Sequence, residues 1–257
     1  MLTSDQKRDL IHDAFVRAES FSGWGKFDIE VRTIGPMLPW SYDALAREAV
    51  SQSRATLDIA TGGGERLLSI AEGLNGTRIV ATEAWHINAP IAARALAPLG
   101  VAVVRSSAGE DGTLPFRDAS VDLVLNRHGP IDVPEIDRVL QPGGRFLTQQ
   151  VDPLDWPELM TYFPRITLRF DNSHEKRAAQ FRALGYDVRS KRHDYRVAYA
   201  TIADLAYNLA VAPWTIPDFE FSRDCDALLA LDAQQFTTEG IEMTRALYLL
   251  SAAKPAG

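Results

Sequence analysis

Hydrophobic and polar positions between residues 54 and 151 follow the pattern of strands joined by helices. Short apolar runs predict strands at 55–60, 78–82, 101–105, 121–125 and 144–151. Helical periodicity predicts intervening helices at 64–74, 87–97 and 132–140. The run Val101-Ala-Val-Val places apolar residues at successive positions, which is typical of parallel strands buried on both faces. The pattern therefore predicts an α/β fold with a doubly wound, mostly parallel sheet.

The regions on either side are less regular. Residues 5–19 predict an amphipathic helix, the Gly/Pro/aromatic segment 21–40 is expected to be largely irregular, and Ser41 is a candidate cap for a helix reaching Val50. The later pattern predicts a helix at 173–184, a strand at 186–195, helices at 201–211 and 222–231, and a strand at 245–254. We expect one domain, with an N-terminal helical cap (1–53), a ligand-binding core (54–195 and 241–254) and a lid-like insertion (196–240).

The strongest chemical signal is a glycine turn between a predicted strand and a predicted helix. The strand carries Asp58, and the turn contains Gly62, Gly63 and Gly64. Glycines leave the backbone N–H groups of a helix N-terminus open to a ligand and allow backbone angles that side chains forbid. The third glycine of a dinucleotide-binding loop would fall on Glu65, whose carboxylate repels a pyrophosphate but tolerates a cation. A nucleoside ligand without phosphates therefore fits better than a dinucleotide.

Glu83 follows the apolar run 79–81 at the end of the second predicted strand of the core. A carboxylate in that place can accept hydrogen bonds from both hydroxyls of a ribose. The alternative is that Glu83 caps the helix that begins near Ile87. Its position after the glycine turn favours the ligand role.

Four motifs occur in register: Leu57-Asp-Ile-Ala-Thr-Gly-Gly-Gly-Glu, the acidic Glu83, Leu114-Pro-Phe-Arg-Asp-Ala-Ser-Val-Asp-Leu-Val, and Arg138-Val-Leu-Gln-Pro-Gly-Gly-Arg-Phe. Together they resemble the class I S-adenosylmethionine-dependent methyltransferases, in the branch of small-molecule enzymes with an LPF segment and an RVL-x-PGG turn. The resemblance covers about residues 54–152 and implies a Rossmann-like fold. The chain departs from the family pattern at Ala60, which replaces the first glycine, and at Glu65.

The resemblance also implies S-adenosylmethionine as cofactor and a set of binding residues. Asp58, Ala60, Gly62 and Gly64 would surround its methionine part, and Glu83 its ribose. Either Glu110 or Asp111 would lie near the adenine amino group, with Glu110 favoured by spacing. The full set of candidate cofactor-binding residues is Asp58, Ala60, Thr61, Gly62, Gly64, Glu83, Ala84, Glu110, Asp111, Asn126 and Arg127.

The chemistry asked of these residues is limited, because the sulfonium already activates its methyl group. Orientation of the acceptor alone can supply ~7–11 kcal/mol. Where a proton must leave the acceptor, His128 is the best candidate base, with a bond to the neighbouring backbone as the alternative role. Asn126 and Tyr162 are the other candidate catalytic residues.

Composition narrows the classes of partner. The formal net charge is −7 in 257 residues, which disfavours nucleic acid as a ligand. Cys225 is the single cysteine and the five histidines share no metal-ligand spacing, so neither a disulfide nor a metal site is expected. The N-terminus resembles no secretion signal and no apolar run reaches membrane-spanning length, so we expect a cytoplasmic protein that does not bind membranes.

Several functions stay open at this point. The preferred one is methyl transfer to a small metabolite by a monomer or homodimer. A second keeps the cofactor but cyclises or cleaves its aminobutyryl part and releases methylthioadenosine. A third is a binding protein that retains the nucleoside site without turnover. Methylation of RNA or protein is the fourth, and the acidic charge disfavours RNA.

Overall fold

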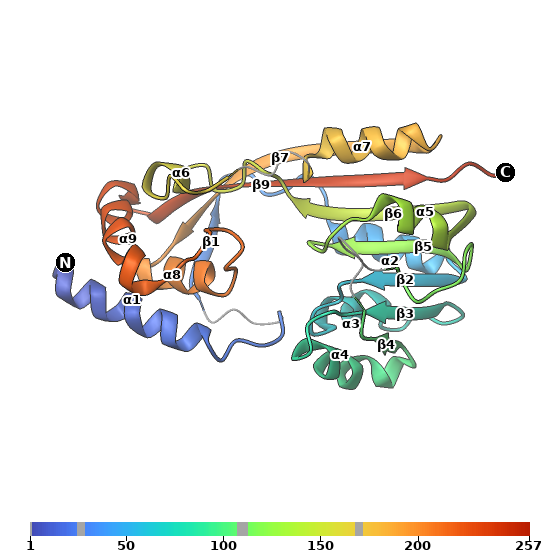
Figure 1. The fold of residues 1–257 in the computed structure, drawn as a ribbon, viewed down its shortest axis with the longest axis horizontal. Coiled ribbons are helices and arrows are strands. Elements are labelled where there is room, and N and C mark those ends of the chain that lie inside the picture. Colours follow the sequence, from blue (N-terminus) through green and yellow to red (C-terminus); the bar gives the residue numbers. More distant parts are fainter. Residues whose placement is uncertain (1, 25–28, 107–112, 168–171) are drawn as a thin grey trace.

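In a computed structural model, the chain forms a nine-stranded mixed sheet with helices on both faces (Figure 1). The structure describes residues 2–24, 29–106, 113–167 and 172–257. The strand order is β1-β7-β9-β6-β5-β2-β3-β4, and the short β8 pairs with β9. The expected α/β fold with a doubly wound, mostly parallel, Rossmann-like sheet is therefore confirmed for the core.

The parallel half of the sheet holds the predicted core. Its strands are β2 (Ala55–Ile59), β3 (Arg78–Thr82), β4 (Ala102–Val104), β5 (Val121–Arg127) and β6 (Leu140–Val151). The helices around it are α2 (Tyr42–Ser51), α3 (Glu65–Ala71), α4 (Asn88–Leu96), α5 (Val133–Val139) and α7 (His174–Ala183), with a 3₁₀ turn at Ala97–Leu99. Every pairing in this half is parallel, so the carboxyl ends of the strands meet at one edge, where ligands bind in such sheets.

The other half of the sheet is antiparallel and extends beyond the core. Strand β9 (Gly240–Ala253) lies between β6 and β7 (Asp187–Tyr199) and pairs antiparallel with both. Strand β1 (Val31–Ile34) adds to the outer edge of β7, and β8 (Phe236–Thr237) forms a hairpin with β9. Strands β7 and β9 are long enough to run out of the core into a second group of helices (Figure 1).

We call this group the second lobe. It contains α1 (Ser4–Ala18), α6 (Leu159–Tyr162), α8 (Ile202–Ala210) and α9 (Phe221–Gln235), together with β1 and the outer ends of β7 and β9. These elements pack around one apolar cluster that includes the buried side chains of Ile11, Phe163, Tyr199, Leu228 and Met243. The N-terminal helix and the insertion between β7 and β9 therefore fold together, although they are far apart in sequence.

The structure differs from the sequence-based elements in three places. The segment 21–40 contains β1, because its backbone pairs with the edge of β7. Strand β7 continues to Tyr199 and β9 begins at Gly240, so both strands are longer than predicted. Strand β6 begins at Leu140, ahead of the predicted start. In each case pairing with a distant strand decides the boundary, and this pairing leaves no local periodic signal.

Arg138 explains why the LPF and RVL motifs occur together. Its guanidinium donates to the backbone oxygens of Leu114 and Phe116 at 2.9 and 2.8 Å. It also donates to Asp118 and, with two bonds of 2.7 and 2.8 Å, to Glu135. One side chain of α5 thereby holds the segment that precedes β5 against the sheet.

We therefore expect Arg138→Gln to lower the free energy of unfolding by about 2–3 kcal/mol, because charge-assisted bonds to Glu135 and two backbone oxygens are lost. Urea unfolding followed by circular dichroism measures this change. Arg94→Gln is the matched control, because Arg94 is an exposed arginine of α4. Equal stability of the two variants would contradict the structural role of Arg138.

Candidate functional site

The glycine loop at the end of β2 has a mostly left-handed backbone. Three of its residues have left-handed backbone angles: Ala60 with φ 59°, Gly62 with φ 65° and Gly64 with φ 86°. The N–H of Thr61 donates to the carbonyl of Thr82 at 2.9 Å, which ties the loop to the end of β3. Gly64 is the N-terminal cap residue of α3, so the loop leads directly into a helix N-terminus, where N–H groups face outward.

Glu83 is buried at the end of β3 and organises this loop. Its Oε2 accepts a hydrogen bond from the N–H of Gly62 at 2.7 Å, and its Oε1 accepts one from the N–H of Trp85 at 2.8 Å. Each carboxylate oxygen can accept a second hydrogen bond. Glu83 can therefore hold the loop and still accept from the two hydroxyls of a ribose.

Asp58 is a buried carboxylate with no cationic partner among the residues that the structure describes. Burial raises its pKa to about 7; the Thr61 hydroxyl works against this rise and the charge of Glu83 adds to it. A buried carboxylate is stabilised in its charged form by a nearby cation. Asp58 is therefore suited to a positively charged group bound next to the glycine loop.

The segment that ends at Trp24 covers the glycine loop. The N–H of Gly23 donates to Asn88 at 2.8 Å, and the N–H of Trp24 donates to Glu65 at 3.2 Å. The Trp24 ring lies so close to Gly62 that a Cβ there would be 2.7 Å from its Cδ1. Glu65 thus anchors a segment 41 residues away in the sequence. From the sequence, Glu65 could be interpreted only by the effect of its charge on a ligand.

At the end of β5, Asn126 supports the backbone of the next turn. Its Oδ1 accepts from the N–H of Gly129 at 3.1 Å and from Gln150 at 2.7 Å. Its Nδ2 donates to the carbonyl of Pro130 at 2.8 Å. The side chain is fully buried and engaged on both ends. Asn126 is thus placed to position the neighbouring residues.

His128 follows β5 with a left-handed φ of 60°. Its N–H donates to the carbonyl of Gln149 at 2.9 Å, and its Nε2 lies 3.4 Å from the side-chain nitrogen of Gln149. Desolvation by the surrounding protein lowers the pKa of His128 well below 6.5, and the positive charges of Arg127, Arg245 and Arg66 lower it further. The ring keeps access to solvent and is neutral at pH 7, so it can accept a proton but is a weak base.

The remaining candidate residues are more scattered. Ala84 is exposed directly after Glu83, and Glu110 and Asp111 lie outside the described residues. Tyr162 belongs to the second lobe, where its hydroxyl donates to Gln234 of α9 at 3.0 Å and its ring packs on the apolar cluster. The structure thus brings together the candidates on β2, β3 and β5 and places Tyr162 with the helices of the second lobe.

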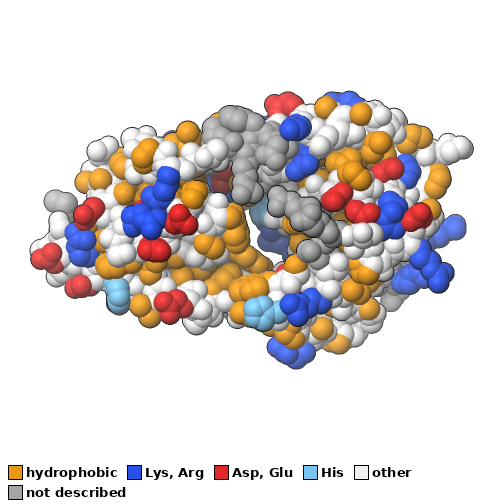
Figure 2. Space-filling view, in the orientation of Figure 1, with side chains coloured by type: hydrophobic (Ala, Val, Ile, Leu, Met, Phe, Trp, Pro, Cys, Tyr) orange, Lys and Arg blue, Asp and Glu red, His pale blue; other side chains and the backbone are white. Residues whose placement is uncertain are grey.

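Between the core and the second lobe the surface is hollowed, with apolar side chains gathered along the side of the second lobe (Figure 2). The rings of Trp24 and Trp214 approach with centroids 6.0 Å apart, which links the covering segment to the insertion between β7 and β9. Described residues contain no group of three His, Cys, Asp or Glu side chains that could hold a metal ion. No helix among them has the length and apolar character needed to span a bilayer.

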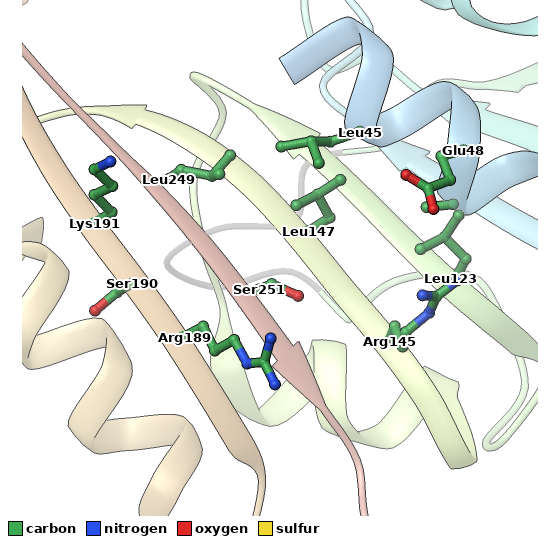
Figure 3. A pocket seen from close by; sticks show the side chains of 11 residues that line it. Leu45, Glu48, Leu123, Arg145, Leu147, Arg189, Ser190, Lys191, Leu249 and Ser251 are labelled. Carbon is green, nitrogen blue, oxygen red and sulfur yellow. The ribbon is translucent and has the colours of Figure 1, made fainter. Parts of the chain in front are cut away.

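A separate groove of roughly 340 Å³ lies on the α2 face of the sheet (Figure 3). Leu45, Leu147 and Leu249 gather at its centre, with Arg145 and Arg189 on one side. Arg145 and Leu147 lie in the middle of β6, and neither the glycine loop nor Glu83 is among the residues that line the groove. The groove is therefore distinct from the candidate site.

Comparison with known proteins places a methyltransferase domain on this part of the chain. Residues 57–148 match the model of a family described as a methyltransferase domain. The ubiquinone/menaquinone biosynthesis C-methyltransferase UbiE of Brucella anthropi is 28% identical over 176 residues. That match covers 60% of this chain and 62% of the relative, so the chain aligns with less than two thirds of the relative's length.

Two solved structures resemble the fold at low sequence identity. The YcgJ protein of Bacillus subtilis has a TM-score of 0.60 and 18% identity, covering 84% of this chain and 99% of that chain. A functionally unknown protein from Deinococcus radiodurans R1 has a TM-score of 0.59 and 18% identity, covering 87% of this chain and 90% of that chain. At such identity the likeness concerns the fold alone.

The raised pKa of Asp58 predicts a pH-dependent gain in stability for Asp58→Asn. Ionisation of Asp58 disfavours the folded state, so the wild type loses stability as the pH rises from about 4 through 7. One pKa unit corresponds to about 1.4 kcal/mol, so the variant should gain about 2 kcal/mol more at pH 8 than at pH 5. Urea unfolding at the two pH values measures this difference. A gain of equal size at both values would show that the Asp58 carboxyl does not titrate differently in the folded protein.

Proposed function

We propose that this chain, which contains a class I S-adenosylmethionine-dependent methyltransferase domain, transfers the methyl group of S-adenosylmethionine to a small molecule bound between the core and the second lobe. This family uses S-adenosylmethionine as its methyl donor. The observation that carries the proposal is the buried Glu83, which holds the N–H of Gly62 and keeps acceptor capacity for a ribose.

The residues of the site fit such a cofactor. The glycine loop offers close backbone approach, Glu83 offers acceptors for sugar hydroxyls, and the unpaired Asp58 offers a negative charge for the amino-acid end. Thr82 Oγ1 and Asn88 Nδ2 are buried near the loop without a hydrogen-bond partner among the described residues. Buried polar atoms of this kind are normally satisfied by a ligand or water.

The cofactor supplies an activated methyl group, so the chain has to bind, orient and exclude water. In the proposed transfer the methyl group would leave the sulfur for the acceptor, and S-adenosylhomocysteine would remain. His128 is neutral and can take a proton from an oxygen or nitrogen acceptor, although its low pKa makes it a weak base. Orientation of the acceptor in the hollow is therefore the larger contribution.

A small acceptor agrees with the rest of the molecule. The net charge of −7 disfavours a nucleic-acid acceptor, and the apolar side chains along the second lobe favour one with an apolar part. The curated relative is named a C-methyltransferase. Carbon is therefore the first acceptor atom to examine here, followed by oxygen and nitrogen.

The decisive experiment is incubation of the purified protein with S-adenosylmethionine, alone and with pools of small aromatic and aliphatic metabolites, followed by mass spectrometry. Acceptor-dependent S-adenosylhomocysteine supports the proposal. Methylthioadenosine formed without an acceptor supports cleavage or cyclisation of the aminobutyryl part instead. Tight binding with neither product supports a binding protein.

Glu83→Gln should weaken binding of S-adenosylhomocysteine by about tenfold or more, because a charge-assisted hydrogen bond contributes about 1.5–3 kcal/mol. Glutamine keeps an oxygen for the N–H of Gly62 but turns its NH2 group toward the N–H of Trp85, so circular dichroism has to show that the variant folds like the wild type. Isothermal titration calorimetry measures the affinity, with Glu72→Gln as control because Glu72 is exposed beyond α3. Unchanged affinity would show that Glu83 does not bind the ribose hydroxyls.

A further inference from the structure

Gln149, near the end of β6, contacts both the backbone and the ring of His128. Its carbonyl accepts from the N–H of His128 at 2.9 Å, and its side-chain nitrogen lies 3.4 Å from Nε2 of the ring. Gln149 is buried, whereas His128 is exposed. The turn at His128 lies beside the glycine loop, because a Cβ on Gly129 would be 2.6 Å from the Cβ of Ala60. The state of this ring therefore matters to a ligand bound at the loop.

Trp40 fixes the direction in which the side-chain amide of Gln149 points. The Nε1 of Trp40 donates to Oε1 of Gln149 at 2.8 Å. An indole N–H can only donate, so the amide oxygen must face Trp40 and the NH2 group must face His128. Trp40 is itself held in place, since Ser41 caps α2 directly after it and its ring meets that of His193 with centroids 6.3 Å apart.

An NH2 group that faces Nε2 selects one neutral form of the imidazole. In that form Nε2 accepts the hydrogen bond and the proton is on Nδ1. The other tautomer and the imidazolium would each place an N–H of the ring against the NH2 group. Desolvation and the charges of Arg127, Arg245 and Arg66 also disfavour the imidazolium, because they lower the pKa of the same ring. In the described part of the chain Nδ1 has no hydrogen-bond partner, so its N–H is available to a ligand.

We propose that Trp40 and Gln149 are positioning residues that keep the proton of His128 on Nδ1, so that His128 donates a hydrogen bond to an oxygen of the methyl acceptor. The inference rests on the proposed function and deepens it, because it requires an oxygen near the reacting atom of the acceptor. It also separates His128 from proton removal. A proton could be taken up only at Nε2, which Gln149 already contacts.

A fixed N–H donor favours an acceptor with an ionised oxygen, such as an enolate or a phenolate, because hydrogen bonds to charged groups are the stronger ones. Such an acceptor has already lost its proton to water, so methyl transfer to it needs no base. Its electron pair would form the new bond to the methyl carbon, with the pair of the broken bond left on sulfur. An aliphatic amine is protonated at pH 7 and would need a base first, so amines are the disfavoured class.

Nitrogen-15 NMR of protein labelled on histidine distinguishes the two tautomers without cofactor or acceptor. The signal of His128 is assigned by its loss in His128→Asn, and the wild type should show Nδ1–H. Gln149→Glu should move the proton to Nε2 and raise the pKa of the ring, because a carboxylate accepts from an N–H and stabilises a cation. Trp40→Phe should give a mixture of tautomers, because the amide of Gln149 can then turn over. Gln141→Glu, near the other end of β6, is the matched control and should keep Nδ1–H. Circular dichroism checks that each variant folds.

The acceptor class is tested with S-adenosylmethionine and two pools of compounds, one of phenols and 1,3-dicarbonyl compounds and one of primary amines. Mass spectrometry of S-adenosylhomocysteine measures the rate, and the wild type should turn over the first pool only. Gln149→Glu should lower that rate about tenfold or more, because the N–H donor is lost and the new carboxylate repels an ionised oxygen. Gln141→Glu should keep the rate of the wild type.

The outcomes separate this inference from the proposed function. An Nε2–H signal in the wild type would overturn the inference, whatever the protein catalyses. Persistence of Nδ1–H in both Gln149→Glu and Trp40→Phe would overturn the positioning roles of these two residues. Turnover of the amines, or a faster reaction in Gln149→Glu, would assign His128 to proton removal instead. Absence of S-adenosylhomocysteine with every acceptor would overturn the proposed function and the acceptor class together, and would leave the tautomer of His128 as measured.

Discussion

The hydrogen bond from the N–H of Gly62 to the carboxylate of Glu83 is the constraint on which the rest of the site depends. It joins the loop after β2 to the end of β3, and it helps to hold a loop in which Ala60, Gly62 and Gly64 are left-handed. At Ala60 the side chain makes that conformation costly. Because the loop is held in this shape, the N-terminus of α3 faces the sheet edge, and Trp24 can pack directly on Gly62. The same carboxylate thus organises the protein and remains available to a ligand.

The antiparallel strand β9 determines where the second half of the site can be. Because β9 inserts between β6 and β7 and continues past the end of β6, the sheet leaves the core and carries the second lobe with it. The partly buried ion pair of Arg245 and Asp155, with Arg245 over the ring of Trp156, joins β9 to the segment that follows β6. The hollow in Figure 2 therefore results from the length of β7 and β9, which carry the second lobe away from the core. The helices of that lobe come from both ends of the chain.

The core could be predicted from the sequence because its signals are local. Apolar runs and helical periodicity define β2 to β6 and the helices between them, and the glycines and Glu83 lie where parallel strands end. Contacts between distant segments could not be predicted in this way. Strand β1 forms because it pairs with the edge of β7. Glu65 accepts a hydrogen bond from the N–H of Trp24, and Asn126 accepts one from the N–H of Gly129 in the turn that follows it. Tyr162 was a candidate by position alone, and packing of α6 on α9 places it in the second lobe.

The electrostatics of the site indicate that these residues are arranged for a ligand rather than for stability. A buried Asp58 with a raised pKa disfavours the protein without a ligand, whereas the neighbouring Arg66 and Arg245 form ion pairs with Asp43 and Asp155. If burial alone had decided these positions, apolar or paired side chains would be more stable there. A cationic group of a ligand would compensate the charge of Asp58, and binding energy would then offset a cost that folding has already met. The surroundings of His128 act in the opposite sense on a cation: burial, followed by the positive charges of Arg127, Arg245 and Arg66, lowers the pKa of its imidazole and keeps it neutral.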